Sequence, residues 1–253
     1  MEKTDYAPGT PMRIDIGADI PKAEAFYGGL FGWETTEPGD PEETGGYKMF
    51  TYKGKLVAGL GPQQAPGAPY WTTYICTDDA DATAEKVKQA GGMVFVEPMD
   101  VMDAGRMAIF ADPAGAAFGV WQANQHRGAE LVNEPNTLVW NELQTRDLEA
   151  AKAFYPAVFG VGVGGAPEYV EWQVNGEAVG AAMAMAPGVP DQVPSNWLTY
   201  FAVDDCEAAV EKATSLGASL MMGPMDVPVG RFAVLADDQG AAFAVIKMSG
   251  EHD

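Results

Sequence analysis

Apolar and polar residues alternate along this chain with two periods, one typical of strands and one typical of helices. After a strand expected at residues 12–17, apolar side chains recur at the i, i+3, i+4, i+7 spacing of one buried helical face. They are Ala23, Phe26, Tyr27 and Leu30. Asp19 stands before this helix as a capping residue, and Gly32 follows it as a stop. The pattern therefore predicts a strand followed by an amphipathic helix.

Further strand-like runs follow, separated by glycine and proline. Gly54 lies between two of them and predicts a hairpin. The Asp78-Asp79 pair stands where a second helix begins, and the turn Asp112-Pro113-Ala114-Gly115 joins the last two strands. Strands expected in this half include residues 12–17, 47–53, 56–61, 71–77, 107–111 and 117–122.

The second half of the chain repeats the first. Ala25-Phe26-Tyr27-Gly28 returns as Ala153-Phe154-Tyr155-Pro156, and Trp71-Thr72-Thr73-Tyr74 returns as Trp197-Leu198-Thr199-Tyr200. Equivalent residues of the two halves are separated by a long and nearly constant number of positions. This indicates two fused copies of one fold rather than a solenoid of short repeats. Pro156 predicts an early end or a kink in the repeated helix, because proline costs about 3 kcal/mol in a helix interior.

Each copy is thus predicted to hold two units of one strand, one helix and three strands. We expect an α+β chain of two tandem domains, at residues 1–125 and 137–249, with a polar linker at 126–136 and a tail at 250–253. The sequence leaves open whether neighbouring units pair with each other or the first unit pairs with the fourth.

Composition narrows the class of protein. The 36 acidic and 15 basic residues give a formal charge of −21, which would repel nucleic acid and anionic lipid surfaces. Cys76 and Cys206 occupy non-equivalent places and fit neither a metal site nor a disulfide framework. No run of apolar residues is long enough to cross a bilayer, and the N-terminus lacks an apolar leader. We expect a cytoplasmic protein that binds neither nucleic acid nor membrane.

The order of these elements, with a helix ending near Phe-Tyr and Phe-Gly and a later Asp-Pro-x-Gly hairpin, resembles the vicinal oxygen chelate superfamily. That group includes glyoxalase I, the bleomycin-resistance binding proteins and the extradiol dioxygenases. The resemblance covers nearly the whole chain, once in each half. It implies two tandem glyoxalase-like domains whose four βαβββ units form curved, cup-shaped mixed sheets with helices packed outside. In many members the cup holds a divalent metal on His, Glu or Gln.

The metal ligands that this resemblance implies are replaced here. Their positions fall on Met12 or Arg13, Thr72 and Gly119 in the first copy and on Trp140, Leu198 and Ala244 in the second. The choice between Met12 and Arg13 depends on where a one-residue gap is placed. The two histidines, His126 and His252, lie outside every expected position. We therefore expect no metal and no other cofactor.

Two carboxylates remain on the same strand face. Asp15 and Glu142 stand two residues beyond the first-strand ligand position, so the period of two points them into the cup. In an apolar cup, desolvation would raise the pKa of each carboxyl towards the range useful for proton transfer. Alternatively, each carboxylate accepts hydrogen bonds from nearby donors and only holds the sheet together.

Two tyrosines lie on the same strand face as the replaced metal-ligand positions Thr72 and Leu198, because each stands two residues further along the strand. Tyr74 and Tyr200 could donate a hydrogen bond to a substrate carbonyl or a developing oxyanion, or they could be half-buried strand residues that contribute mainly area. We take Asp15, Glu142, Tyr74 and Tyr200 as the catalytic candidates. The candidate ligand-binding residues are Trp140, Trp121, Met12, Gln144 and Leu198. Trp71 and Trp197 fall on the opposite face and are assigned to helix packing.

Three functions follow from this arrangement. The first is metal-independent acid/base chemistry, such as isomerisation, cyclisation or elimination, on a hydrophobic, aromatic or carbonyl-bearing small molecule. The second is a sequestering receptor without chemistry, as the bleomycin-resistance resemblance implies, and the third is a glyoxalase I-like lyase with an unrecognised metal site. A structural scaffold is favoured only if both cups are filled by their own side chains. We expect a monomer or homodimer whose second, Trp140-bearing cup is the more active one.

Overall fold

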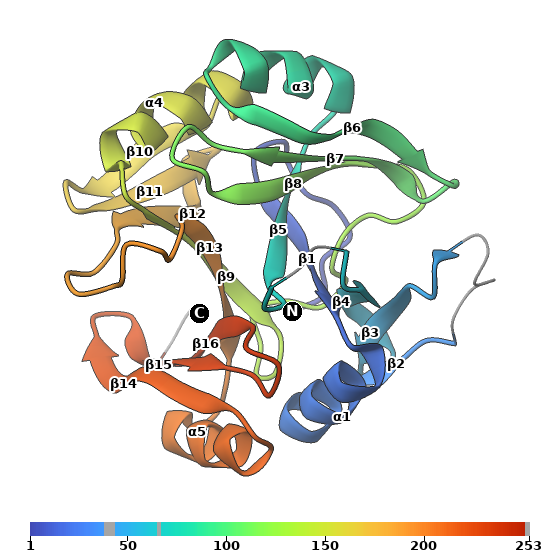
Figure 1. Ribbon diagram of the computed structural model, residues 1–253, viewed down its shortest axis with the longest axis vertical. Coiled ribbons are helices and arrows are strands. Elements are labelled where there is room, and N and C mark those ends of the chain that lie inside the picture. Colours follow the sequence, from blue (N-terminus) through green and yellow to red (C-terminus); the bar gives the residue numbers. More distant parts are fainter. Residues whose placement is uncertain (38–43, 65–66, 251–253) are drawn as a thin grey trace.

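The computed structural model describes residues 1–37, 44–64 and 67–250. The strands of the first half form one eight-stranded mixed sheet in the order β2-β3-β4-β1-β5-β8-β7-β6 (Figure 1). Its elements are β1 Pro11–Ala18, α1 Ile20–Phe31, β2 Glu34–Thr35, β3 Lys48–Tyr52, β4 Lys55–Pro62, β5 Trp71–Cys76, α3 Ala80–Gln89, β6 Met93–Val101, β7 Gly105–Ala111 and β8 Ala117–Ala123.

The second half builds an equivalent sheet, ordered β10-β11-β12-β9-β13-β16-β15-β14. Its elements are β9 Leu138–Thr145, α4 Leu148–Phe159, β10 Gly162–Ala166, β11 Tyr169–Val174, β12 Glu177–Ala184, β13 Asn196–Ala202, α5 Cys206–Ser215, β14 Ser219–Val227, β15 Gly230–Ala236 and β16 Ala242–Met248. Neighbouring units therefore share a sheet, which decides the pairing that the sequence left open. The predicted α+β class with two tandem glyoxalase-like domains is confirmed.

The first helix of each half follows its sequence signals. Asp19 caps α1 by accepting a hydrogen bond from the Lys22 N–H, and Gly32 ends it with a left-handed φ of 72°. The predicted apolar face of α1 is buried. In the second half, α4 runs through Pro156 to Phe159, so the early end predicted there is wrong. Phe154, Tyr155 and Val158 are buried beside this proline, and their burial offsets its cost in the helix.

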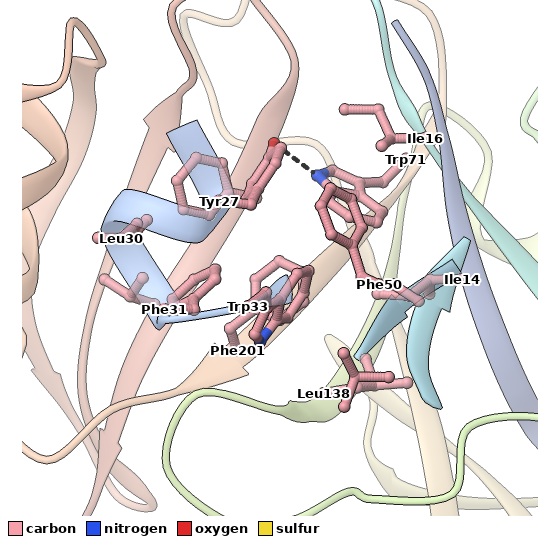
Figure 2. Packing of buried hydrophobic residues seen from close by; sticks show 14 of the residues in the cluster. Ile14, Ile16, Tyr27, Leu30, Phe31, Trp33, Phe50, Trp71, Leu138 and Phe201 are labelled. Atoms are coloured by element: carbon pink, nitrogen blue, oxygen red, sulfur yellow. Dashed lines mark hydrogen bonds between the residues drawn. The ribbon is translucent and has the colours of Figure 1, made fainter. Parts of the chain in front are cut away.

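The helices lie between the two sheets, and their cores cross from one half to the other. The buried face of α1 packs on Phe50 and Trp71 of its own sheet and on Phe201 of the second (Figure 2). It also contacts Phe243 of the second sheet. At the opposite end, α3 and α4 share a second core with Phe118 and Trp197. Figure 1 shows α1 beside α5 and α3 beside α4. The two cups are consequently arranged back to back, with their concave faces turned away from each other.

Trp71 and Trp197 serve these cores, as the sequence predicted. Trp71 Nε1 donates to the Tyr27 hydroxyl at 3.0 Å, and Trp197 Nε1 donates to the Tyr155 hydroxyl at 3.1 Å. At the centre of the interface, the Thr73 hydroxyl donates to Asn141 Oδ1 of the other half at 2.9 Å. Polar contacts therefore fix how the two halves sit on each other.

The segment between the sheets is bound to the first half. Ala129, Leu131 and Val132 are buried, and the Ala129 N–H donates to the Met12 carbonyl at 2.9 Å. Tyr6 donates its hydroxyl to the Ala129 carbonyl at 2.7 Å. The segment predicted as a polar linker thus packs along the first sheet. In the described part of the chain, no helix is long and apolar enough to span a bilayer.

Candidate functional site

Strand register fixes which residues of the two cups are equivalent. Arg13 pairs with Tyr74 and Asp15 with Thr72 in the first half. In the second half, Trp140 pairs with Tyr200 and Glu142 with Leu198. Arg13 is therefore the counterpart of Trp140, and Asp15 is the counterpart of Glu142. Because Ile14 and Ile16 lie in the core beneath the sheet, their neighbours Arg13 and Asp15 face the concave side.

The first cup contains a buried ion pair. Arg13 donates from Nη2 to Asp15 Oδ2 at 3.2 Å and to the Tyr47 hydroxyl at 2.5 Å. Tyr47 in turn donates to Asp15 Oδ2 at 3.2 Å. The Arg13 and Asp15 side chains are only 7% and 14% exposed. Burial raises the pKa of Asp15, and the Arg13 charge and the hydrogen bonds from Tyr74, Tyr47 and Thr72 oppose that rise.

Aromatic rings enclose the Arg13 guanidinium. Its carbon lies 4.7 Å from the centre of the Tyr74 ring and 4.5 Å from that of Trp121. Met12 joins this concave cluster, although alternation alone would place it beneath the sheet with Ile14. A register shift between Pro11 and Arg13 turns it over. The first cup is thus filled by its own side chains around Arg13.

The second cup contains a buried carboxylate to which the described residues supply no cation. Tyr200 donates its hydroxyl to Glu142 Oε1 at 2.9 Å, and Gln144 Nε2 donates to the same oxygen at 3.2 Å. Glu142 is only 4% exposed, and no ion pair to it occurs among residues 1–37, 44–64 and 67–250. Burial, and next the Glu142 charge, raise the pKa of both Tyr169 and Tyr200, so these phenols stay protonated.

Apolar side chains line the second cup beside this carboxylate. Leu198, Tyr200, Ala244 and Ile246 form its buried wall, and the partly buried Trp140 and Phe232 pack against them. The ring centres of Tyr200 and Phe232 are 6.0 Å apart. Trp140 Nε1 donates to the Tyr169 hydroxyl at 3.1 Å, which links Trp140 of β9 to Tyr169 of β11. The structure therefore brings Glu142, Gln144, Tyr200, Leu198 and Trp140 together.

The structure keeps the other candidates apart from these residues. Asp15, Tyr74, Trp121 and Met12 belong to the first cup, on the other sheet. The candidate residues therefore form two clusters, one in each cup, as their places in the two copies of the sequence predicted.

Two tyrosines at the cups were missed by sequence reasoning. Tyr47 and Tyr169 approach Asp15 and Glu142 from the neighbouring hairpin of each half. The Tyr47 ring lies across Gly59 and Gly61, where any Cβ would collide with it. Their equivalent positions at the start of the duplicated hairpin were the available signal. The chain offers no local pattern that shows which strand they cross.

The donor set does not fit the metal site that the fold resemblance implies. In the described ranges, no three His, Cys, Asp or Glu side chains gather closely enough to hold a metal ion. Arg13 places a permanent positive charge at the ligand position of the first cup, where a second cation would be repelled. The second cup offers Glu142 with Trp140, Leu198 and Ala244, none of which replaces the missing ligands.

A comparison with family models matches residues 16–120 and 125–245 to the "Glyoxalase/Bleomycin resistance protein/Dioxygenase superfamily". The chain is 43% identical over 258 residues to "Putative glyoxylase CFP32" of Mycobacterium bovis, covering 97% of each protein. It is 41% identical over 266 residues to "Anthracycline biosynthesis protein DnrV" of Streptomyces peucetius, covering 97% of this chain and 95% of that protein.

Among solved structures, the Mn(II)-bound glyoxalase from Novosphingobium aromaticivorans is similar with a TM-score of 0.66 and 18% identity. The match covers 95% of this chain and 82% of that one. At this identity the likeness concerns the fold alone.

Proposed function

The chain belongs to the glyoxalase/bleomycin resistance protein/dioxygenase superfamily, and we propose that its second cup is a metal-independent catalytic site for proton transfer. Its substrate is a hydrophobic small molecule that carries a carbonyl group, with aromatic character to match the walls of the cup. Isomerisation, cyclisation and elimination are the reactions that such a site serves.

The buried carboxylate of Glu142 carries this proposal. Taking a carboxylate out of water is costly, and no cation among the described residues compensates for it. A receptor that needs only apolar contact gains nothing from this cost. A carboxylate held among phenols is instead a recurring arrangement for acid/base work, so Glu142 supports catalysis over sequestration.

The chemistry follows from the groups that surround Glu142. A carboxylate oxygen takes a proton from the carbon next to the substrate carbonyl. The C–H bond breaks, its electron pair forms a carbon–carbon double bond, and the carbonyl oxygen becomes an oxyanion. Tyr200 or Tyr169, both protonated, donates a hydrogen bond to that oxyanion. Protonated Glu142 then returns the proton at another carbon, or assists a leaving group to depart.

The second cup is preferred to the first because the ion pair of the first is satisfied internally. Asp15 already has Arg13 and Tyr47 as partners, and the Tyr47 ring covers Gly59 and Gly61 of the neighbouring strand β4. Among the described residues, the hydrogen-bond partners of Glu142 are neutral side chains, such as those of Tyr200 and Gln144. The relative named for anthracycline biosynthesis supports an aromatic, carbonyl-bearing ligand.

The test begins by incubating the purified chain with a library of aromatic carbonyl compounds and measuring turnover and solvent deuterium exchange. For any compound that reacts, Glu142→Gln should lower kcat about a hundredfold or more. Asp15→Asn should retain most of the activity. Equal turnover by Glu142→Gln and the parent protein would make the carboxylate structural and the proposed mechanism wrong.

Sequestration without chemistry is the second candidate, favoured by the filled first cup and the apolar walls of the second. It predicts a compound that binds the second cup, undergoes neither turnover nor deuterium exchange, and binds Glu142→Gln as tightly as the parent.

A further inference from the structure

The two cups share one polar framework. A carboxylate stands at equivalent positions, Asp15 and Glu142, and each is approached by two phenols. The phenols are Tyr74 and Tyr47 in the first cup and Tyr200 and Tyr169 in the second. Because the frameworks correspond residue by residue, the contents of one cup indicate what the other is shaped to hold.

In the first cup this framework surrounds a cation. The Arg13 guanidinium is paired with Asp15, hydrogen-bonded to Tyr47 and held over the rings of Tyr74 and Trp121. These are the contacts that proteins use to recognise organic cations, a carboxylate together with aromatic faces. The first cup is therefore a cation site whose ligand is part of the chain.

The second cup keeps the framework, but none of the described residues places a cation in it. Trp140 replaces Arg13, and its indole N–H donates to Tyr169 instead of to the carboxylate. Ile246 stands at the position of Trp121 and leaves that side of the cup with a smaller group. Glu142 remains hydrogen-bonded to Tyr200, whose ring centre lies 6.0 Å from that of Phe232, and no described residue supplies a cation to this carboxylate.

We propose that the second cup takes an external organic cation, a protonated amine or amidine carried by a hydrophobic ligand, in the place that Arg13 fills in the first. The ligand's N–H⁺ groups pair with Glu142, and its carbon skeleton lies against Tyr200, Phe232 and Trp140. The inference rests on the proposed function in taking the second cup as the substrate site, and it adds the charge of the substrate. A cationic nitrogen also acidifies the neighbouring C–H bonds, which assists removal of a proton from carbon.

The experiment measures binding of three matched probes to the full-length protein by calorimetry near pH 7. They are 2-phenylethylamine, which is cationic, 2-phenylethanol, which is neutral, and 3-phenylpropanoate, which is anionic. The amine should bind at least about tenfold more tightly than the alcohol, and the anion should bind most weakly. Added salt should weaken the binding of the amine only. Glu142→Gln should lower the affinity for the amine to that for the alcohol.

Two further variants make the result specific. Glu177→Gln removes an exposed carboxylate of the same half and should leave the amine preference unchanged. Trp140→Arg supplies the second cup with an internal cation, as in the first, and should abolish amine binding while the protein stays folded. If Glu142→Gln proves unfolded, the Trp140→Arg result still decides the question.

Equal affinity for amine and alcohol, no binding of the amine at millimolar concentration, or an amine preference that survives both Glu142→Gln and Trp140→Arg would overturn the inference. Such results leave the proposed function standing, because that depends on the loss of turnover in Glu142→Gln with a carbonyl substrate. Conversely, an amine preference without any Glu142-dependent turnover would uphold the cation site and contradict catalysis.

Discussion

Tyr27, on the first helix of one half, donates its hydroxyl proton to Asp237 of the other half at 2.8 Å. The contact is duplicated, since Tyr155 of the second half donates to Asp112 of the first at 3.2 Å. Each aspartate also accepts backbone N–H bonds of its own turn, from Ala116 to Asp112 and from Ala241 to Asp237. A helix of one half thereby holds a hairpin of the other, twice over.

Tyr27→Phe should therefore destabilise the whole protein, by about 1–3 kcal/mol in urea unfolding, because Trp71 and Asp237 both lose a buried partner. Tyr70→Phe is the matched control, since Tyr70 is 52% exposed, and it should change stability by less than about 0.5 kcal/mol. Indistinguishable unfolding curves for the two variants would show that the contact between the halves contributes nothing.

Residues 1–125 expressed alone should not form a cooperative monomer, although they contain the complete first sheet. The fragment loses the side chains of Phe201 and Phe243 that cover α1, and exposes a large apolar face. Near-ultraviolet circular dichroism and urea unfolding will show this, and co-expression with residues 126–253 should restore a cooperative transition. A stable, monomeric fragment would mean that the crossed cores are dispensable.

Stability should fall as the pH drops from about 6.5 towards 3 because of His126. Burial lowers the pKa of His126 to about 3, and the Arg13 charge adds to the effect. Below about pH 6.5 the unfolded chain binds a proton at His126 and the folded chain does not. The free energy of unfolding therefore falls with decreasing pH throughout this window, by at most about 1.4 kcal/mol per pH unit. Above pH 6.5 both states carry a neutral His126 and the effect vanishes.

His126→Gln isolates this contribution, because carboxyls such as Asp15 and Asp112, whose pKa burial raises, titrate in the opposite sense in both proteins. The difference in unfolding free energy between parent and variant should slope with pH below 6.5 and be flat above it. A difference that is flat at every pH would refute the buried, neutral histidine.

Arg13→Met should lower the free energy of unfolding by about 3–5 kcal/mol, since it leaves Asp15 buried without its cation. Adding Asp15→Asn should recover much of the loss, because the unpaired charge is then gone. A double-mutant cycle of unfolding free energies measures the coupling, and simple additivity of the two single changes would argue against a working ion pair.

Dialysis against a chelator should leave both the melting temperature and any turnover unchanged, because the described residues of the concave faces offer no set of metal ligands. Elemental analysis that finds a stoichiometric transition metal required for activity would contradict this. It would also favour the third hypothesis, a glyoxalase-type metal centre.

Periodicity and duplication predicted the helices, the strands and the two tandem copies, and the resemblance to the vicinal oxygen chelate superfamily implied the curved sheets and their cups. The apolar face of α1, its caps Asp19 and Gly32, and the inward facing of Asp15 and Glu142 all depend on neighbours within a few residues. Such local relations can be read along one strand or helix. The same holds for Trp71 and Trp197, whose odd spacing from Tyr74 and Tyr200 placed them beneath the sheet.

Only the tertiary structure decided what each cup contains. Tyr47 and Tyr169 reach the carboxylates from another strand, and the ion pair of Arg13 needs the ring of Trp121, more than a hundred residues away, to complete its surroundings. The crossing of α1 onto the second half depends likewise on contacts distant in sequence. A single sequence does not show which distant side chains come into contact, because a contact between residues far apart in the chain produces no pattern among their sequence neighbours. The sequence by itself therefore determined two copies of one fold with a carboxylate at equivalent strand positions, which its family resemblance places in cups. Folding decided that Asp15 is paired with a cation and that, among the described residues, no cation pairs with Glu142.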